Sequence, residues 1–212
     1  MLIKRSFVFG LAVTLTSFVA GAQQLFEELP PGKTGVNFRN TIRESQKANV
    51  LTYEYFFNGG CVAIGDINNY GLEDIYFTAN MSANKLFLNE GNLRFRDITE
   101  SSATGCDDGW KTGVTMADVN ADGYLDIYVC LSGKGDPEMR RNKLYINNRD
   151  LTFTERAREY GLDDPGHTTH ASFFDFDRDG DLDMYLLNHN ITVVREFEFS
   201  KARKTRHPYA GD

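Results

Sequence analysis

Three nine-residue acidic segments, spaced along the chain, set the strongest limit on how it can fold. They read DINNYGLED (66–74), DVNADGYLD (118–126) and DFDRDGDLD (175–183), and we name them loops 1, 2 and 3. Each has Asp at positions 1 and 9 and Gly at position 6. Apolar, β-prone runs flank every segment, so each is predicted to join two strands. Repetition of such a unit predicts an all-β chain.

The spacing of the acidic residues is that of a calcium-binding loop. Carboxylates crowded this closely repel one another unless a cation lies between them. Calcium takes hard oxygen ligands, and Gly at position 6 allows a sharp turn. Position 7 is expected to bind through its backbone carbonyl. The predicted ligands are Asp66, Asn68, Tyr70, Leu72 and Asp74 in loop 1, Asp118, Asn120, Asp122, Tyr124 and Asp126 in loop 2, and Asp175, Asp177, Asp179, Asp181 and Asp183 in loop 3.

The three loops differ in the charge that they offer to a metal ion. Loop 3 has Asp177 and Asp179 at positions 3 and 5, whereas loop 1 has Asn68 and Tyr70. Because ligand charge helps to set calcium affinity, loop 3 is predicted to bind most tightly, then loop 2, then loop 1. The frame is not an EF-hand, since position 12 is apolar and lies in a strand-like run. The alternative is that the loops are solvated acidic turns without an ion.

A larger repeat surrounds the loops. NKLFLNEGNLRFRDIT (84–99) follows loop 1, and NKLYINNRDLTFTERA (142–157) follows loop 2 after a polar insertion at 132–141. NEGN and NNRD supply the residues of tight turns. Each unit therefore reads strand, acidic loop, strand, strand, tight turn, strand. Four antiparallel strands in such a unit predict a β-propeller blade.

These units resemble FG-GAP/VCBS repeats, the calcium-loop blades of integrin α-chain propellers and of many bacterial surface proteins. The stretches 53–89 and 109–133 are more narrowly similar to the amino-terminal part of the ASPIC/UnbV (cartilage acidic protein-like) group. The resemblance covers about residues 35–190. It implies a β-propeller with metal on its hairpin loops, and it implies no defined reaction. Tyr70 departs from the pattern, because Asp is usual at that position.

The predicted domain organisation has three parts. Residues 1–22 read as a secretory signal peptide, with Lys4 and Arg5 before an apolar run and a small-residue cleavage site. A single membrane anchor is the alternative. Residues 23–58 form a lead-in segment. Residues 59–212 hold the repeats, with blades at about 59–100, 110–158 and 168–212, and the last blade incomplete. The chain is thus expected to be a piece of a longer, truncated propeller, or else a small domain that assembles with other chains.

Charge and residue content narrow the expected function. The net charge is −7 and no general basic patch stands out, so no nucleic acid is expected as a partner. Signal cleavage would leave no membrane span, and the expected location is the periplasm, the outer surface or the extracellular space. The expected role is a non-enzymatic module that binds an unknown protein or surface glycan, with Ca²⁺ structural. The alternative is a propeller-fold polysaccharide-active enzyme or a non-catalytic part of one, because paired carboxylates can act on glycosides.

Cysteine and histidine residues give weaker signals. The odd number of cysteines, Cys61, Cys106 and Cys130, leaves at least one thiol outside any disulfide within the chain, and spacing does not fix a pairing. HTTH (167–170) precedes the predicted first strand of the third blade. Counted back from the first Asp of each loop, Cys61, Gly113 and His170 are equivalent positions. They are expected near one rim of the propeller channel.

Overall fold

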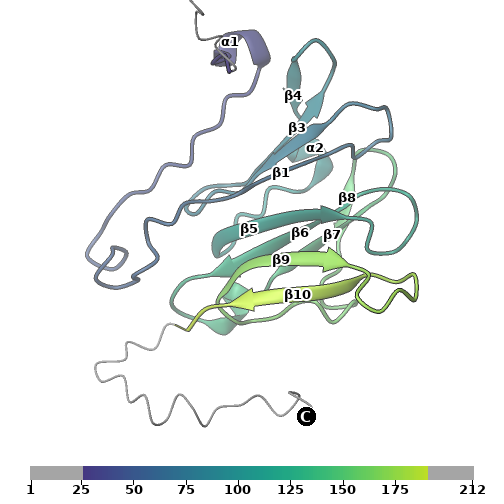
Figure 1. The fold of residues 1–212 in the computed structure, drawn as a ribbon. Coiled ribbons are helices and arrows are strands. Elements are labelled where there is room, and N and C mark those ends of the chain that lie inside the picture. Colours follow the sequence, from purple (N-terminus) through teal and green to yellow (C-terminus); the bar gives the residue numbers. More distant parts are fainter. Residues whose placement is uncertain (1–25, 191–212) are drawn as a thin grey trace, which may run out of the picture.

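Three antiparallel sheets, one for each acidic loop, make up the computed structural model, which describes residues 26–190 (Figure 1). We name them blades 1, 2 and 3. Blade 1 contains β1 (Val62–Gly65), β2 (Asp74–Phe77), β3 (Lys85–Asn89) and β4 (Phe95–Asp97). Blade 2 contains β5 (Trp110–Ala117), β6 (Asp126–Ser132), β7 (Lys143–Asn147) and β8 (Phe153–Glu155). Blade 3 contains β9 (Thr168–Phe174) and β10 (Asp183–Asn188). The predicted all-β class with four-stranded blades is confirmed.

Short helical turns complete the described structure. They are α1 (Pro31–Thr34), α2 (Thr99–Ser102) and the 3-10 helix η1 (Pro137–Arg140). The last of these lies in the segment predicted as a polar insertion. None of the helices in residues 26–190 has the length and apolar character needed to cross a membrane.

Strand register is the same in all three hairpins that carry the acidic loops. The Asp at position 9 pairs with the residue just before position 1, as in Gly65↔Asp74 and Ala117↔Asp126. In blade 3 the matching pair is Phe174↔Asp183. The acidic loop is therefore the same hairpin connection each time, at the same end of its strands.

Blade 2 is buried on both faces because it lies between its two neighbours. Side chains of a strand point alternately to the two faces of a sheet. In β6, Ile127, Val129 and Leu131 belong to a core shared with blade 1. Tyr128 and Cys130 belong to a second core shared with blade 3. This alternation explains why every residue of β6 is buried.

The first strands of the blades lie side by side, with β5 between β1 and β9 (Figure 1). The hydroxyl of Thr78 donates to the Thr112 carbonyl at 2.9 Å, and the Thr112 hydroxyl donates to the Thr168 carbonyl at 2.7 Å. A Cβ at Gly113 would overlap the carbonyl oxygen of Thr169. Glycine is needed there because the two strands approach so closely.

The lead-in segment packs on blade 1 instead of standing apart from it. The ring of Phe38 stacks on Phe77, with centroids 4.7 Å apart. The side chain of Asn40 donates to Asn80 Oδ1 at 2.7 Å and accepts from the Asn80 backbone N–H at 3.1 Å. Further along, Tyr53 is buried. The segment thus fixes one wall of the molecule near the starts of β1 and β5.

The third blade begins earlier in the chain than its apolar pattern indicates. The prediction that HTTH precedes the first strand of blade 3 is wrong for His170, which lies inside β9. Pairing with β10, including Leu187↔His170, extends the strand further back than the apolar pattern indicates. The predicted signal peptide and the end of the third blade, beyond residue 190, lie outside the described residues. Cys61, Cys106 and Cys130 are free thiols.

Candidate functional site: the acidic loops

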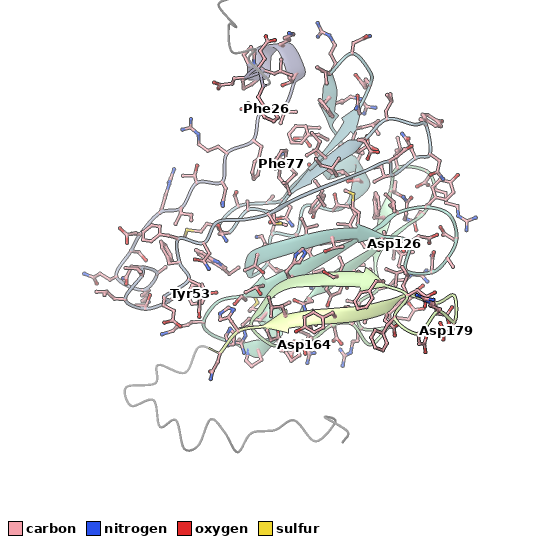
Figure 2. The ribbon with its side chains drawn as sticks, viewed as in Figure 1. Phe26, Tyr53, Phe77, Asp126, Asp164 and Asp179 are labelled. Atoms are coloured by element: carbon pink, nitrogen blue, oxygen red, sulfur yellow. The ribbon has the colours of Figure 1, made fainter. Side chains whose placement is uncertain are left out.

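The three acidic loops gather at one end of the strands. Figure 2 shows Asp126 and Asp179 at this end and Tyr53 at the opposite end. Loops 1 and 2 are in direct contact, because the side-chain amide of Asn69 donates to the carbonyl of Gly123 at 2.8 Å. Loops 1 and 2 are thus linked directly and are not isolated turns.

Each loop folds around the carboxylate at position 1. This carboxylate accepts a hydrogen bond from the backbone N–H of the Gly at position 6, which has a left-handed backbone that suits glycine. The three bonds run from Gly71 to Asp66 at 2.6 Å, from Gly123 to Asp118 at 2.8 Å and from Gly180 to Asp175 at 3.2 Å. The φ angles of the three glycines are 79°, 88° and 98°. The local fold therefore follows from two residue types at a fixed spacing.

The carboxylate at position 9 holds the loop to the sheet. Asp126 accepts from the backbone N–H of Val119 at 3.0 Å and from that of Asn147, in β7, at 2.8 Å. Asp74 accepts in the same way from Ile67 at 3.0 Å and from Asn89 at 2.7 Å. Both carboxylates are completely buried. In loop 3, Asp183 is exposed and accepts from Phe176 at 2.8 Å.

Burial changes the acidity of these position 9 groups. Burial raises the pKa of Asp126 to about 6, although the N–H groups of Asn147 and Val119 act in the opposite direction. The negative charges of Asp122 and Asp118 raise it further. Burial likewise raises the pKa of Asp74. A cation in the loop would oppose these shifts, because a nearby positive charge favours the ionised carboxylate.

Loop 3 brings three carboxylates together. One oxygen from each of Asp175, Asp177 and Asp183 lies within 4.8 Å of the other two. Within residues 26–190 this is the only group of three or more His, Cys, Asp or Glu side chains with that geometry. Asp179 accepts from the N–H of Asp181 at 3.0 Å, which orders the turn beside the cluster. All five side chains are exposed, so an ion from solvent can reach them.

Loop 2 is contacted by a basic side chain from outside the loop. Arg149, in the β7–β8 turn, lies 3.1 Å from Asp122 Oδ2 and above the ring of Tyr124, 5.6 Å from its centroid. Partial burial acts to raise the pKa of Asp122, but the N–H of Tyr124 and the Arg149 guanidinium outweigh it and lower the pKa. Asn120 donates to the same carboxylate at 3.1 Å. The Asp122 carboxylate is thus held by Arg149, Asn120 and the Tyr124 N–H.

Loop 1 has the fewest carboxylates at the predicted ligand positions, namely Asp66 and Asp74. Its backbone is ordered by Asp66, which accepts from the N–H of Tyr70 at 3.2 Å, and by Asn68, which accepts from the same N–H at 3.1 Å. The Tyr70 side chain is 83% exposed, so it does not complete a buried site. Leu72 is also exposed.

Loop 3 fits a hard divalent cation well, and loops 1 and 2 fit it less fully. Carboxylate and carbonyl oxygens are the ligands that calcium prefers. Three carboxylates as close as those of loop 3 repel one another without a cation. The ligand assignment for the fifteen loop residues stays a prediction. Loop 3 alone gathers three carboxylates within 4.8 Å in residues 26–190, and the ranking of loop 2 above loop 1 also stays a prediction.

Two kinds of residue that contact the loop carboxylates were not predicted from the sequence. Asn89 and Asn147, which fasten the third strands to the loops, are the last residues of NKLFLN and NKLYIN, and this equivalence was a signal. The repeat gave no indication of Arg149, because the residue at the equivalent position of blade 1 is Gly91.

The equivalent positions before the loops also meet in space. Cys61, Gly113 and His170 all line one cavity of about 290 Å³. The cavity lies at the starts of β1, β5 and β9, at the opposite end from the acidic loops. These three positions therefore lie together, and their place at the rim of a propeller channel stays a prediction.

Comparisons with known proteins agree with this architecture. The sequence profile of the FG-GAP-like repeat family matches residues 57–129 and 131–186. A relative, Cartilage acidic protein 1 of Xenopus tropicalis, is 31% identical over 153 residues, which are 71% of this chain and 23% of the relative. The chain therefore spans less than a quarter of the length of this curated relative. With matches across both complete blades and the hairpin of the third, the chain belongs to the FG-GAP-like repeat family.

Proposed function

We propose that the chain is an exported, calcium-binding β-propeller module that mediates interaction with a protein or a surface glycan. One observation carries the calcium part of this proposal. The carboxylates of Asp175, Asp177 and Asp183 converge within 4.8 Å, on a nine-residue frame that recurs twice more in the chain.

The role proposed for calcium is structural. In each loop the first and last carboxylates already accept backbone N–H groups, so a bound ion would lie among groups that shape the hairpin. The ion would also relieve repulsion between the carboxylates. Extracellular modules bind calcium with Kd of about 10⁻⁴–10⁻³ M, and sites of that strength fill outside the cytoplasm.

The interaction part of the proposal rests on family and architecture. The family consists of repeat modules with blade-like sheets, and the homologue is a cartilage acidic protein. The acidic loops occupy one end of the strands, and we place the partner contact at the other end, where two cavities lie. Adhesion and export are likewise part of the proposal.

A thermal melt of the full chain in calcium, in magnesium and in EDTA tests the calcium part. An ion that binds only the folded state adds about 2.7 kcal/mol when its concentration is 100 times Kd. We expect calcium to raise the melting temperature and magnesium to raise it less. Asp177→Asn should reduce the calcium shift, whereas Asp107→Asn, an exposed aspartate outside the loops, should not.

A cooperative melt that ignores calcium would overturn the metal assignment. The loops would then be acidic turns ordered by their own N–H groups. A calcium shift that Asp107→Asn reduces as much as Asp177→Asn does would show a general charge effect instead of a site in loop 3.

A further inference from the structure

A second cavity, of about 330 Å³, lies at the end of the molecule opposite the acidic loops. It is enclosed by the lead-in segment, the start of β5 and the loop between β6 and β7. We name it the Trp110 cavity. Its size is near the lower end of the range of about 300–1,000 Å³ typical of small-ligand sites. A single ring of a ligand, and not a long chain, matches this size.

Aromatic rings form one wall of the cavity. The indole of Trp110 lies 5.1 Å from the ring of Phe56 and 5.7 Å from that of Tyr53, measured between centroids. Phe56 and Tyr53 are buried, whereas Trp110 is half-buried and lines the cavity. The two buried rings therefore hold the indole in place. Its accessible part offers an apolar surface.

Close backbone approaches define the other walls. Gly133 lies against Trp110, and a Cβ there would come within 2.9 Å of the Trp110 Cβ. Gly109 lies so near Met139 that a Cβ would overlap the Met139 carbonyl oxygen. Ser132 shares a 2.9 Å hydrogen bond with the Tyr53 hydroxyl at the base. Packing thus fixes the walls at Trp110 and Gly109, whereas exposed side chains such as Lys47, Lys134 and Met139 form the rim.

The charge at the cavity is opposite to that of the chain. Lys47, Lys134 and Arg140 line it, with Asp136 as its one acidic side chain, although the chain carries a net charge of −7. Arg140 is fixed by donating to the Gly135 carbonyl at 2.7 Å and to the Pro165 carbonyl at 3.3 Å. Cations beside an apolar platform favour an anion that also has an apolar face.

We propose that the Trp110 cavity binds one anionic pyranose ring, a uronic acid residue of an acidic glycan. The C–H face of a pyranose is apolar and would lie on the indole of Trp110. The C6 carboxylate would meet Lys134 and the part of the Arg140 guanidinium that does not hold the Gly135 and Pro165 carbonyls. The hydroxyls would donate to Asp136 and to Thr52 Oγ1, whose own proton is donated to the Asn49 carbonyl at 2.8 Å. This inference rests on the interaction role proposed above and names the ligand class.

An acidic peptide fits the same cavity less well. Its carboxylates could meet the cations, but a flexible side chain of Asp or Glu would leave the indole surface uncovered. It would also bring a second negative charge beside Asp136, whose carboxylate already accepts the Glu138 N–H at 3.0 Å. A neutral sugar would lack a partner for the cations. The anionic ring satisfies both the aromatic wall and the charges.

The chain has a single tryptophan, so its fluorescence reports directly on this cavity. We would titrate the full chain, in saturating calcium and again in EDTA, with D-galacturonate and with D-galactose, which differ only in the carboxylate. We expect a saturable change with galacturonate, half-complete at about 1–10 mM. Galactose should bind at least several-fold more weakly. Saturation-transfer NMR on the ligand protons would check binding independently of fluorescence.

Matched charge variants make the test specific. Lys134→Ala and Arg140→Ala should each weaken galacturonate binding by about tenfold, as expected for the loss of a charge-assisted contact. Arg94→Ala removes a cation from the β3–β4 turn, away from the cavity, and should leave binding unchanged. Because Arg140 also holds two carbonyls, Lys134→Ala on the exposed rim is the variant that keeps the fold intact.

The outcomes separate this inference from the proposed calcium function. Galacturonate binding without a calcium-dependent melt would leave the inference standing and the calcium part overturned. A calcium-dependent melt with no galacturonate signal by fluorescence or NMR would overturn the inference alone. Equal binding of galactose, or preferential binding of a tetra-aspartate peptide, would also overturn it.

Discussion

The backbone N–H of Asn147 donates to Asp126 Oδ1 at 2.8 Å, which fastens the third strand of blade 2 to the last residue of its acidic loop. The other oxygen of Asp126 accepts from Val119 within the loop at 3.0 Å. A residue chosen from sequence as a metal ligand is therefore also a buried link between loop and sheet. A substitution of Asp126 would therefore remove a predicted metal ligand and, separately, the hydrogen bonds that join the loop to the sheet.

Asp126→Ala should destabilise the fold even without calcium. It would leave the buried N–H of Asn147 and the partly buried N–H of Val119 without their acceptor, and a buried one costs about 1–3 kcal/mol when unsatisfied. Urea denaturation in EDTA measures the loss. Asp122→Ala is the control, because it removes a part-exposed ion pair with Arg149, worth about 0–1 kcal/mol, and the acceptor of the part-buried Tyr124 N–H, so its loss should be smaller. Equal losses for the two variants would contradict the structural role of Asp126.

Charge added to the weaker loops should strengthen calcium binding. Asn120→Asp would give loop 2 the acidic pattern of loop 3 at positions 1, 3, 5 and 9, and Tyr70→Asp would add a carboxylate to loop 1. Since ligand charge helps to set affinity, calorimetric titration should show tighter binding in both variants. Asn148→Asp, in the β7–β8 turn outside the acidic frames, adds the same charge as a control. Tighter calcium binding by Asn148→Asp, without tighter binding by Asn120→Asp and Tyr70→Asp, would contradict the assignment of loop positions 3 and 5 as calcium ligands.

Arg149→Gln should have opposite effects with and without calcium. In EDTA the variant loses the contact with Asp122 and the cation above the Tyr124 ring, so it should be less stable by up to about 1 kcal/mol. In calcium it should bind the ion more tightly, because the carboxylate is released from its arginine. Parallel melts in the two buffers give both quantities. A calcium affinity that falls on substitution would show that Arg149 orders the site instead of competing for it.

Gly113→Ala should weaken the packing of blade 2 on blade 3. The new methyl group would overlap the Thr169 carbonyl oxygen and approach His170, and overpacking of this kind costs about 1–3 kcal/mol. Gly32→Ala is the matched control, since nothing lies within 4 Å of the Cβ it would add. Chemical denaturation compares them. A neutral Gly113→Ala would mean that β5 and β9 can move apart at little cost.

Acid should destabilise the fold through His189. Burial lowers its pKa, although Glu54 acts in the opposite direction, and in residues 26–190 neither ring nitrogen has a hydrogen-bond partner. Because the folded-state pKa is below the unfolded value, the unfolded chain binds more protons, and stability falls as pH drops below about 6.5. The free energy of unfolding should therefore fall more between pH 7 and about 5.5 in the wild type than in His189→Gln.

The same comparison should be made in EDTA. There the raised pKa of Asp126 acts with the opposite sign, adding stability as pH falls through about 6, but equally in both proteins. An identical pH response in wild type and variant would show that His189 does not titrate in this range.

The repeat and its strands could be predicted from sequence because they follow from local rules. Asp74 and Asp126 end the acidic frames and begin β2 and β6, as their apolar flanks indicated. Interactions between distant segments could not be predicted in this way. Phe38 stacks on Phe77 and Tyr53 joins Ser132 through packing of an aperiodic segment, which no spacing rule describes. His170 entered β9 because cross-strand pairing extended the strand beyond its apolar core.

The site was predictable to a similar degree. The loop positions were read from spacing, and the clustering of the loop 3 carboxylates agrees with them. The partners that modify those groups come from elsewhere. Arg149 lies 27 residues beyond Asp122, and only the antiparallel return of the chain brings them together. Burial, which changes the acidity of Asp126, is also a property of the stacked sheets and not of the loop.

The hydrogen bond between the Asn69 side chain and the Gly123 carbonyl has a consequence for how the blades behave as a set. Asn147 adds a second link, since its side chain donates to the Ile67 carbonyl of the neighbouring blade at 2.8 Å. Stacked repeats with such nearest-neighbour links behave as a one-dimensional array, in which each unit's order depends on the units beside it. A disturbance in one loop should therefore spread to its neighbour and fade with each further blade.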